Sequence, residues 1–180
     1  MRFHPLTTRS DWLSPLGLIH LSASPQGLSG IFFEDQKHLP NVLDWPKDES
    51  NPFIEKALEW LKAYFNKPAS IHRLPWTTPL DFQSGTEFQQ LVWQELLRIP
   101  MGKTLNYGEL AQRIQRPQAV RAVGAAVGRN PLSLIVPCHR IVGASGHLTG
   151  YAGGLWRKEK LLQWEHLSLD SRTSTKSAHE

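Results

Sequence analysis

The sequence predicts an α/β protein: a small mixed α/β domain, made of a hairpin sheet plus a helix, followed by a mostly helical domain with a helix-turn-helix. Residues 16–23 and 28–33 are β-like runs, and Ser24-Pro25-Gln26-Gly27 between them is typical of a turn, which predicts a hairpin. Apolar residues at helical spacing predict a helix over residues 53–65. The polar residues 34–52 are expected to form a loop, and a short strand is expected at residues 71–74.

The remainder of the chain is expected to be mainly helical. A capping box at Thr86 should begin a helix that extends to residue 99. Asn106 can cap a second helix, and after a tight turn at residues 115–117 a third is expected over residues 118–128. Two short helices joined by a tight turn are typical of a helix-turn-helix.

The last ordered elements are predicted to be a buried strand over residues 132–136 and a helix over residues 155–165. Glu165 would lie on the apolar face of that helix, four residues after Leu161. A carboxylate in that position needs a partner, and a histidine in the core is the natural one. The alternative is a frayed helix end with Glu165 in solvent. The polar residues 168–180 are expected to be a disordered tail.

Cys138 is the only cysteine, and it stands beside His139 and Arg140 within an apolar run. A thiol reacts as its thiolate, and cationic neighbours lower the pKa of a cysteine. These neighbours therefore favour a nucleophilic thiol at the floor of a pocket. The alternative is a small buried side chain with a packing role, which is common for free cysteines.

The composition excludes several classes of protein. One cysteine cannot form an intramolecular disulfide or a cysteine-rich zinc site, and the eight histidines are scattered, so we expect neither a metal nor a cofactor. The N-terminus lacks the apolar core of a signal peptide, and no apolar run reaches the length of a membrane span. We therefore expect a cytoplasmic protein with no membrane partner.

Positive charge is concentrated in the second half. Residues 84–165 hold ten Lys and Arg against five Asp and Glu, whereas residues 1–83 hold eight against nine. In the helix expected at residues 118–128, Val120, Val123 and Val127 should face the core. Small, polar or cationic residues occupy its outer surface: Gln118, Arg121, Ala122, Gly124, Ala125 and Arg129. Close packing of another helix would explain the small residues but not the arginines, so this surface favours DNA.

These features occur together in one pattern. Its residues are Gly85-Thr86, Phe88-Gln89, Val92-Trp93, Ile99-Pro100, Tyr107, Leu110-Ala111, Arg121-Ala122-Val123-Gly124, Asn130-Pro131, Pro137-Cys138-His139-Arg140, Gly150-Tyr151, Gly153-Gly154-Leu155, Lys158, Leu161-Leu162 and Glu165. Over about 80 residues the sequence therefore resembles the O6-alkylguanine-DNA alkyltransferases, also called methylated-DNA–protein-cysteine methyltransferases. Residues 1–83 match that family only in broad character.

The resemblance implies DNA repair by a single, irreversible transfer of an alkyl group from O6-alkylguanine, or from O4-alkylthymine, to Cys138. His139 would deprotonate the thiol through a water molecule, and Glu165 would orient His139 and stabilise its charge. Asn130 would hold the active-site turn, and Tyr107 would donate a hydrogen bond to the guanine ring.

The resemblance also assigns the remaining contacts. The pocket would be formed by Pro137, Tyr151, Ala152, Gly153 and Gly154. The DNA contacts would come from the outer surface of the helix at residues 118–128, placed in the minor groove, and from Arg140. Arg121 would replace the extruded base. The parts would be an N-terminal support domain (1–83), a DNA-binding and alkyl-transfer domain (84–167) and the tail (168–180) of a monomer that binds double-stranded DNA.

Two departures from the family pattern and two alternatives bear on this interpretation. Ala152 stands where some members have a serine hydroxyl that contacts O6, so only a backbone N–H remains there, and the cysteines that some members use for an N-terminal zinc are absent. A non-catalytic DNA-binding protein of the same fold is one alternative, although such relatives carry another residue at the position of Cys138. A cysteine hydrolase is the other, but adjacent side chains of an extended segment point apart, which disfavours a direct Cys138–His139 dyad.

Overall fold

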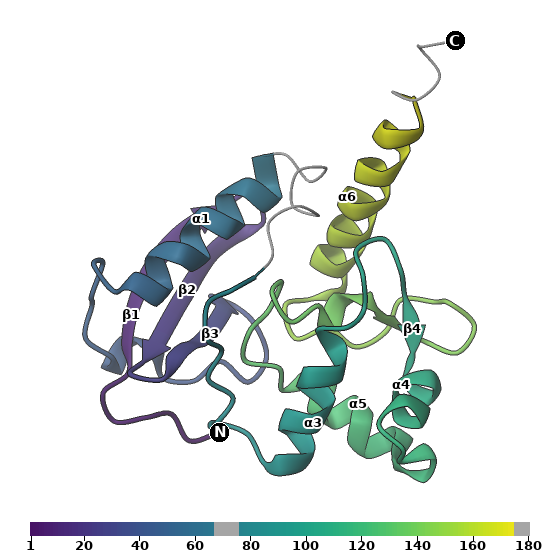
Figure 1. Ribbon diagram of the computed structural model, residues 1–180, viewed down its shortest axis with the longest axis horizontal. Coiled ribbons are helices and arrows are strands. Elements are labelled where there is room, and N and C mark those ends of the chain that lie inside the picture. Colours follow the sequence, from purple (N-terminus) through teal and green to yellow (C-terminus); the bar gives the residue numbers. More distant parts are fainter. Residues whose placement is uncertain (67–75, 175–180) are drawn as a thin grey trace.

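The computed structural model describes residues 1–66 and 76–174, and its first half is a three-stranded antiparallel sheet crossed by a helix (Figure 1). The strands β1 (Thr8–Ser14), β2 (Gly17–Ser24) and β3 (Gly27–Phe33) lie in sequence order. The predicted hairpin is confirmed as β2 and β3, with Ser24 paired to Gly27 beside the turn.

The sequence does not predict β1, because the strand inverts the usual pattern of polar and apolar side chains. Leu13 is 75% exposed, whereas Arg9 is only 8% exposed. The strand is held by its ladder with β2, from Thr8 opposite Ala23 to Ser14 opposite Gly17.

Helix α1 (Pro52–Asn66) confirms the helix predicted at residues 53–65 and packs on the sheet. Its buried face consists of Ile54, Ala57, Leu61, Tyr64 and Phe65. The expected loop at residues 34–52 contains one short 3-10 helix, η1 (Val42–Asp44). The strand expected at residues 71–74 lies outside the described residues.

Helix α3 (Glu87–Leu96) starts with the predicted capping box at Thr86 and ends three residues earlier than expected. It ends there because residues 97–99 close a tighter turn, in which the N–H of Ile99 donates to the carbonyl oxygen of Leu96 at 3.0 Å. The side chain of Trp93, which is fully buried, donates from Nε1 to the carbonyl oxygen of Ala126 at 2.8 Å and so ties α3 to α5 (Val120–Gly128).

The predicted helix-turn-helix is confirmed. It consists of α4 (Tyr107–Arg113), capped by Asn106, a 3-10 turn η2 (Pro117–Ala119) and α5 (Val120–Gly128). The prediction that Val120 faces the core is wrong, since it is 39% exposed. Ala126 occupies the core in its place, because α5 packs against α3 and α4 on a face centred on Val123 and Val127.

The strand predicted at residues 132–136 does not form. The segment turns instead: Leu134 adopts a positive φ of 74°, and the N–H of Val136 donates to the carbonyl oxygen of Leu132 at 2.9 Å. Only Leu132 joins a sheet, through one parallel bridge to Ile31 of β3. The chain then forms a 3-10 turn, η3 (Cys138–Arg140), and the two-residue strand β5 (Ile141–Val142), which pairs with β4 (Leu105–Asn106).

The last helix, α6 (Leu155–Ser174), extends nine residues beyond the predicted end at Glu165. No Gly or Pro occurs in this stretch to end the helix, so the first part of the predicted disordered tail is helical. Residues 175–180 lie outside the described residues.

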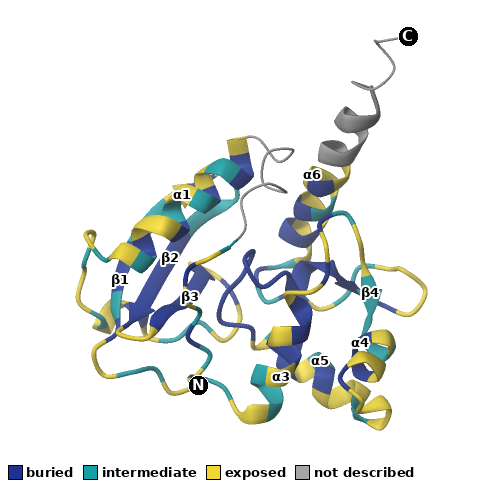
Figure 2. Ribbon diagram, viewed as in Figure 1, coloured by how far each residue is buried: buried dark blue, intermediate teal, exposed yellow. Residues whose placement is uncertain are grey.

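The two halves share one hydrophobic core, visible as the dark blue elements that meet at the centre of Figure 2. It includes Ile31 from β3, Leu61 from α1, Trp93 from α3 and Leu161 from α6. None of the helices in the described part of the chain combines the length and apolar character that a membrane crossing requires.

Candidate active site

Asn130 organises the turn that carries the cysteine. Its Nδ2 donates to the carbonyl oxygen of Val136 at 2.8 Å and to Sγ of Cys138 at 3.0 Å, and its Oδ1 accepts from the N–H of Leu132 at 3.0 Å. All these groups are buried. One amide side chain thus satisfies the backbone of the turn and fixes the direction of the thiol.

Cys138 is 4% exposed at the start of η3. Burial raises the pKa of its thiol above the ordinary value, although the hydrogen bond from Asn130 and the positive charge of Lys158 oppose that rise. The expectation that cationic neighbours lower this pKa is therefore wrong in net effect. The cause is burial, and the guanidinium of Arg140 faces the carboxylate of Glu165 rather than the thiol.

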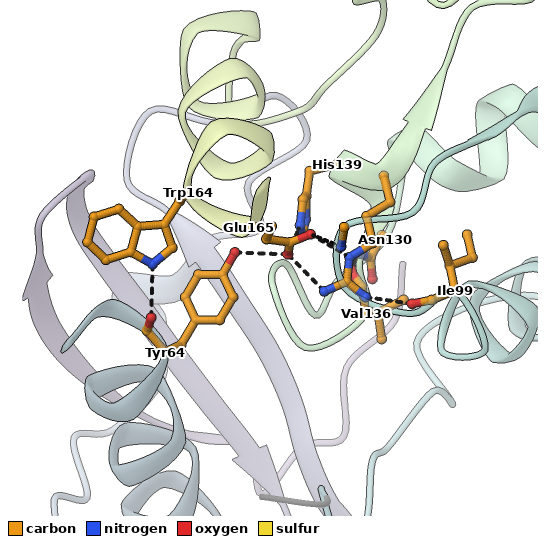
Figure 3. Close-up of polar contacts among 9 residues, drawn as sticks. Tyr64, Ile99, Asn130, Val136, His139, Trp164 and Glu165 are labelled. Carbon is orange, nitrogen blue, oxygen red and sulfur yellow. Dashed lines mark hydrogen bonds and ion pairs between the residues drawn. The ribbon is translucent and has the colours of Figure 1, made fainter. Parts of the chain in front are cut away.

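His139 and Glu165 form the pair that the helical spacing predicted (Figure 3). Nε2 of His139 lies 2.8 Å from Oε1 of Glu165, and both side chains are fully buried. Burial lowers the pKa of His139, and the opposing effect of Glu165 does not cancel this. The ring is thus neutral, with the proton on Nε2 facing the carboxylate, and Nδ1 has no hydrogen-bond partner among the described residues.

Glu165 accepts from two further side chains and one backbone N–H. Arg140 donates from Nε to Oε2 at 2.9 Å and from Nη2 to Oε1 at 2.8 Å, and Tyr64 donates its hydroxyl to Oε1 at 3.0 Å. The N–H of Gly102 lies 3.4 Å from Oε2. Burial alone would raise the pKa of Glu165, but His139 and Arg140 together hold it well below its usual range.

Arg140 is therefore not a surface residue. It is 8% exposed, and its Nη1 donates to the carbonyl oxygen of Ile99 at 2.5 Å. The expectation that Arg140 contacts DNA is corrected, because Nε, Nη1 and Nη2 all bind groups inside the protein.

The loop that follows β5 brings Tyr151 near Cys138. Gly150 and Gly154 have positive φ, and Tyr151 between them is 8% exposed. The N–H of Lys37, in the first half, donates to the carbonyl oxygen of Ala152 at 2.9 Å. A Cβ on Gly153 would lie 2.9 Å from the ring of Phe33, so glycine is needed where the loop meets the first half.

Lys158 and Tyr107 hold the same loop from the other side. Nζ of Lys158 donates to the carbonyl oxygens of Thr149, at 2.5 Å, and Ile141. Burial lowers the pKa of Lys158 to about 8, although Cys138 opposes this shift. Tyr107 is partly buried, and its hydroxyl lies 3.5 Å from the carbonyl oxygen of Thr149. Burial and the proximity of Cys138 raise the pKa of Tyr107.

The outer surface of α5 and its flanks is exposed, as the sequence predicts. Gln118, Arg121, Ala122, Ala125 and Arg129 are exposed, whereas Gly124 is half-buried. A Cβ on Gly124 would lie 3.7 Å from the ring of Tyr107, an ordinary contact distance. Helix α5 and its flanks thus present two arginines and several small residues next to Tyr107.

The family model described as "6-O-methylguanine DNA methyltransferase, DNA binding domain" matches residues 87–167, and the model of that protein's ribonuclease-like domain matches residues 12–81. A methylated-DNA–protein-cysteine methyltransferase of Methanosarcina mazei is 44% identical over 160 residues, which are 87% of this chain and 95% of the relative. The chain belongs to the 6-O-methylguanine DNA methyltransferase family.

Other members agree with this assignment over nearly the whole chain. The methylated-DNA–protein-cysteine methyltransferase of Mycobacterium leprae is 45% identical, over 89% of this chain and 93% of the relative. The crystal structure of Mycobacterium tuberculosis OGT in complex with DNA superposes with a TM-score of 0.74 at 39% identity, covering 90% of this chain and 93% of that one.

In this member of the family the sequence pattern identified Cys138, His139, Glu165 and Asn130. The structure places Asn130 against Cys138 and His139 against Glu165, and Cys138 and His139 are neighbours in η3. The sequence pattern did not assign Lys158 or Tyr64 to the site. Lys158 shares a helical face with Glu165, and that spacing could have revealed it. No comparable signal exists for Tyr64, which lies 101 residues before Glu165 and on another helix. Among the described residues, no group of three or more His, Cys, Asp or Glu side chains is arranged to hold a metal ion.

Proposed function

We propose that the protein repairs DNA by transferring an alkyl group from O6 of a guanine to Sγ of its own Cys138, once per molecule. The observation that carries this proposal is the position of the only cysteine. In a chain that belongs to the methyltransferase family, it lies buried against Asn130 and next in sequence to the His139–Glu165 pair. O4-alkylthymine is proposed as a further substrate.

The neutral thiol and the neutral imidazole fit general-base activation. His139 accepts the thiol proton on Nδ1 through a water molecule, and Glu165 stabilises the imidazolium that results. The thiolate forms a bond to the alkyl carbon as the bond from that carbon to O6 breaks, and the electron pair stays on the guanine. Tyr107 donates a hydrogen bond to the guanine ring as this charge develops. The thioether that remains on Cys138 is not a leaving group, so no second turnover occurs.

The proposed pocket consists of the loop Tyr151, Ala152, Gly153 and Gly154, together with Pro137. Ala152 has no hydroxyl for O6, so its backbone N–H is the group proposed to contact that oxygen. The preference among alkyl groups should then depend on how far the loop can yield. The contact with Phe33 and the hydrogen bond from Lys37 restrain the loop from the N-terminal half.

The proposed DNA surface is the outer face of α5 with Gln118, Arg121, Ala122, Gly124, Ala125 and Arg129. Small side chains allow close approach to the minor groove, and Arg121 takes the place of the extruded base. Its exposure and charge support this role. Arg140 no longer belongs to this set.

Three coarser features complete the proposal. The family models end at residue 81 and begin at residue 87, which supports a boundary near residue 83 between a support domain and the alkyl-transfer domain. A single chain contains every proposed site residue, so a monomer suffices. The cytoplasm is the proposed location, because a reducing compartment keeps the lone thiol available.

Intact mass tests the proposal directly. The protein is mixed with a double-stranded oligonucleotide that contains O6-methylguanine, and we expect each molecule to gain one methyl group in place of one hydrogen. The Cys138→Ala variant should gain nothing but should still bind the oligonucleotide, with an affinity that falls as salt rises. A methyl group gained by Cys138→Ala, or no gain by the wild-type protein, would overturn the assignment. A non-catalytic DNA-binding protein would give the second result.

A further inference from the structure

One side chain from the N-terminal half reaches into the proposed site. Tyr64 lies on the buried face of α1 and is fully buried, and its hydroxyl donates to Oε1 of Glu165 at 3.0 Å (Figure 3). The same oxygen lies 2.8 Å from Nε2 of His139. A half of the chain expected to give only structural support therefore contacts the carboxylate that orients the base.

Tyr64 is itself held firmly. Its ring stacks on Trp60, with centroids 5.3 Å apart and planes 17° apart, and meets Phe65 edge-on at 5.1 Å. Its carbonyl oxygen accepts from Nε1 of Trp164 at 3.1 Å, and Trp164 precedes Glu165 on α6. Side chain and backbone thus fix the hydroxyl relative to Glu165.

We propose that Tyr64 is a positioning residue of the alkyl-transfer site: its hydroxyl holds Oε1 of Glu165 against Nε2 of His139 and stabilises the charged carboxylate, so that His139 stays a neutral base. This inference rests on the proposed function and adds to it a contribution from the N-terminal half. Tyr64 contacts neither the thiol nor the substrate and acts through Glu165.

The hydroxyl of Tyr64 and the ring of His139 both bind Oε1 of Glu165, so each affects how strongly the carboxylate stabilises the other. A hydrogen bond donated to a carboxylate lowers its pKa, and a less basic carboxylate draws the imidazole less strongly toward its protonated form. Loss of the hydroxyl should therefore raise the pKa of both Glu165 and His139. More His139 is then imidazolium at neutral pH, and an imidazolium cannot accept the thiol proton.

The other groups that face this pair come from every element around it. Arg140 of η3 and Lys158 of α6 lower the pKa of His139 by their positive charges, and Arg140 also binds Glu165 directly. Cys138 adjoins His139 in η3, and Tyr151 faces the network from the loop. Burial and the charge of Glu165 raise the pKa of Tyr64 well above its ordinary value, so it remains a donor throughout the working pH range.

The test is the pH dependence of single-turnover transfer from an O6-methylguanine oligonucleotide to the full-length Tyr64→Phe variant. On the acidic side of the pH–rate profile, where the rate falls as the pH decreases, the curve should shift to higher pH by on the order of half a pH unit. At a fixed pH on that side, the variant should then react about threefold more slowly than the wild-type protein. The difference in rate between the variant and the wild-type protein should become smaller at higher pH, where His139 is neutral in both. Ser22→Ala, which removes a buried hydroxyl that lies 3.1 Å from Ser29 in the sheet, should leave the profile in place.

A second comparison asks whether Tyr64 acts through Glu165. In the Glu165→Gln background, at a temperature at which both proteins are folded, Tyr64→Phe should no longer shift the profile. An unchanged profile in the single variant, a loss of equal size at every pH, or the same shift in both backgrounds would each overturn the inference. Failure of the proposed function is a different result, since the wild-type protein would then gain no methyl group.

Discussion

Arg140 and Glu165 meet at two points in the interior of the protein, with Nε 2.9 Å from Oε2 and Nη2 2.8 Å from Oε1. This contact balances the buried carboxylate while His139 is neutral. Burial is the main cause of the lowered pKa of His139 beside this carboxylate, and the positive charge of Arg140 adds to it. The raised pKa of Cys138 and the lowered pKa of His139 both favour the proposed mechanism that starts from a neutral thiol and a neutral imidazole.

Arg140→Lys should lower the free energy of unfolding by about 1–3 kcal/mol and slow alkyl transfer, because an ammonium group cannot reproduce the planar two-point contact. Urea denaturation and a single-turnover assay measure the two effects. Arg98→Lys, at an exposed position just after α3, is the matched control and should change neither quantity. An unchanged unfolding midpoint for Arg140→Lys would argue that the buried contact does not contribute.

Glu165→Gln should slow transfer by about a hundredfold while DNA affinity changes little, because the amide keeps the shape of the side chain but not the charge that stabilises imidazolium. It also leaves Arg140 without its counter-charge, so the assay temperature must be set below the unfolding midpoint of the variant. Single-turnover rates compared with equilibrium affinities separate the two effects. A wild-type rate would reduce Glu165 to a structural residue.

The sequence correctly predicted the elements that are determined by residues close together in the chain. Capping boxes at Thr86 and Asn106, the hairpin turn, and the spacing that buries Glu165 each depend on residues a few positions apart. The strand predicted at residues 132–136 was wrong because the conformation of that segment depends on contacts that the local pattern of apolar residues does not show. An apolar run is typical of a strand, but the side chain of Asn130 binds the backbone at both ends of the segment and Leu134 takes a positive φ.

The candidate site was predictable only as far as the chain order of its residues. The run Cys138-His139-Arg140 does not say where each side chain points, and one 3-10 turn allows His139 and Arg140 to reach the same carboxylate. The family resemblance placed Arg140 on the DNA surface, whereas the structure turns its side chain inward to Glu165 and Ile99. The contact between Tyr64 and Glu165 could not be predicted, because helical spacing indicates only that Tyr64 is one of the buried residues of α1.

Arg121→Ala should slow repair of O6-methylguanine in a duplex more than reaction with the free base. Extrusion of a base costs a few kcal/mol, and an arginine that fills the gap repays part of that cost, whereas a free base has none to overcome. Rates on the two substrates, measured side by side, give the comparison. Arg129→Ala is the control, because its loss should weaken binding without separating the two substrates; equal losses for Arg121→Ala would contradict the proposed role.

The methylated protein should be less stable than the unreacted one. Sγ of Cys138 lies in a closely packed interior, 3.0 Å from Nδ2 of Asn130, with residues 131–143 all buried around it. A methyl group must be accommodated there, and overpacking an interior typically costs about 1–3 kcal/mol. Charge contributes little to this difference, because the raised pKa of the thiol means that the resting form is already neutral.

Thermal midpoints of protein reacted with free O6-methylguanine and of untreated protein, both freed of guanine, measure this cost. A benzyl group should lower the midpoint more than a methyl group does, unless the loop from Tyr151 to Gly154 moves. That loop is restrained by the hydrogen bond from Lys37 and the contact between Gly153 and Phe33, so its movement should also loosen the join to the N-terminal half. Hydrogen exchange at the N–H of Lys37 would report such loosening. A midpoint that stays the same or rises on methylation would mean that the pocket accepts the group without strain.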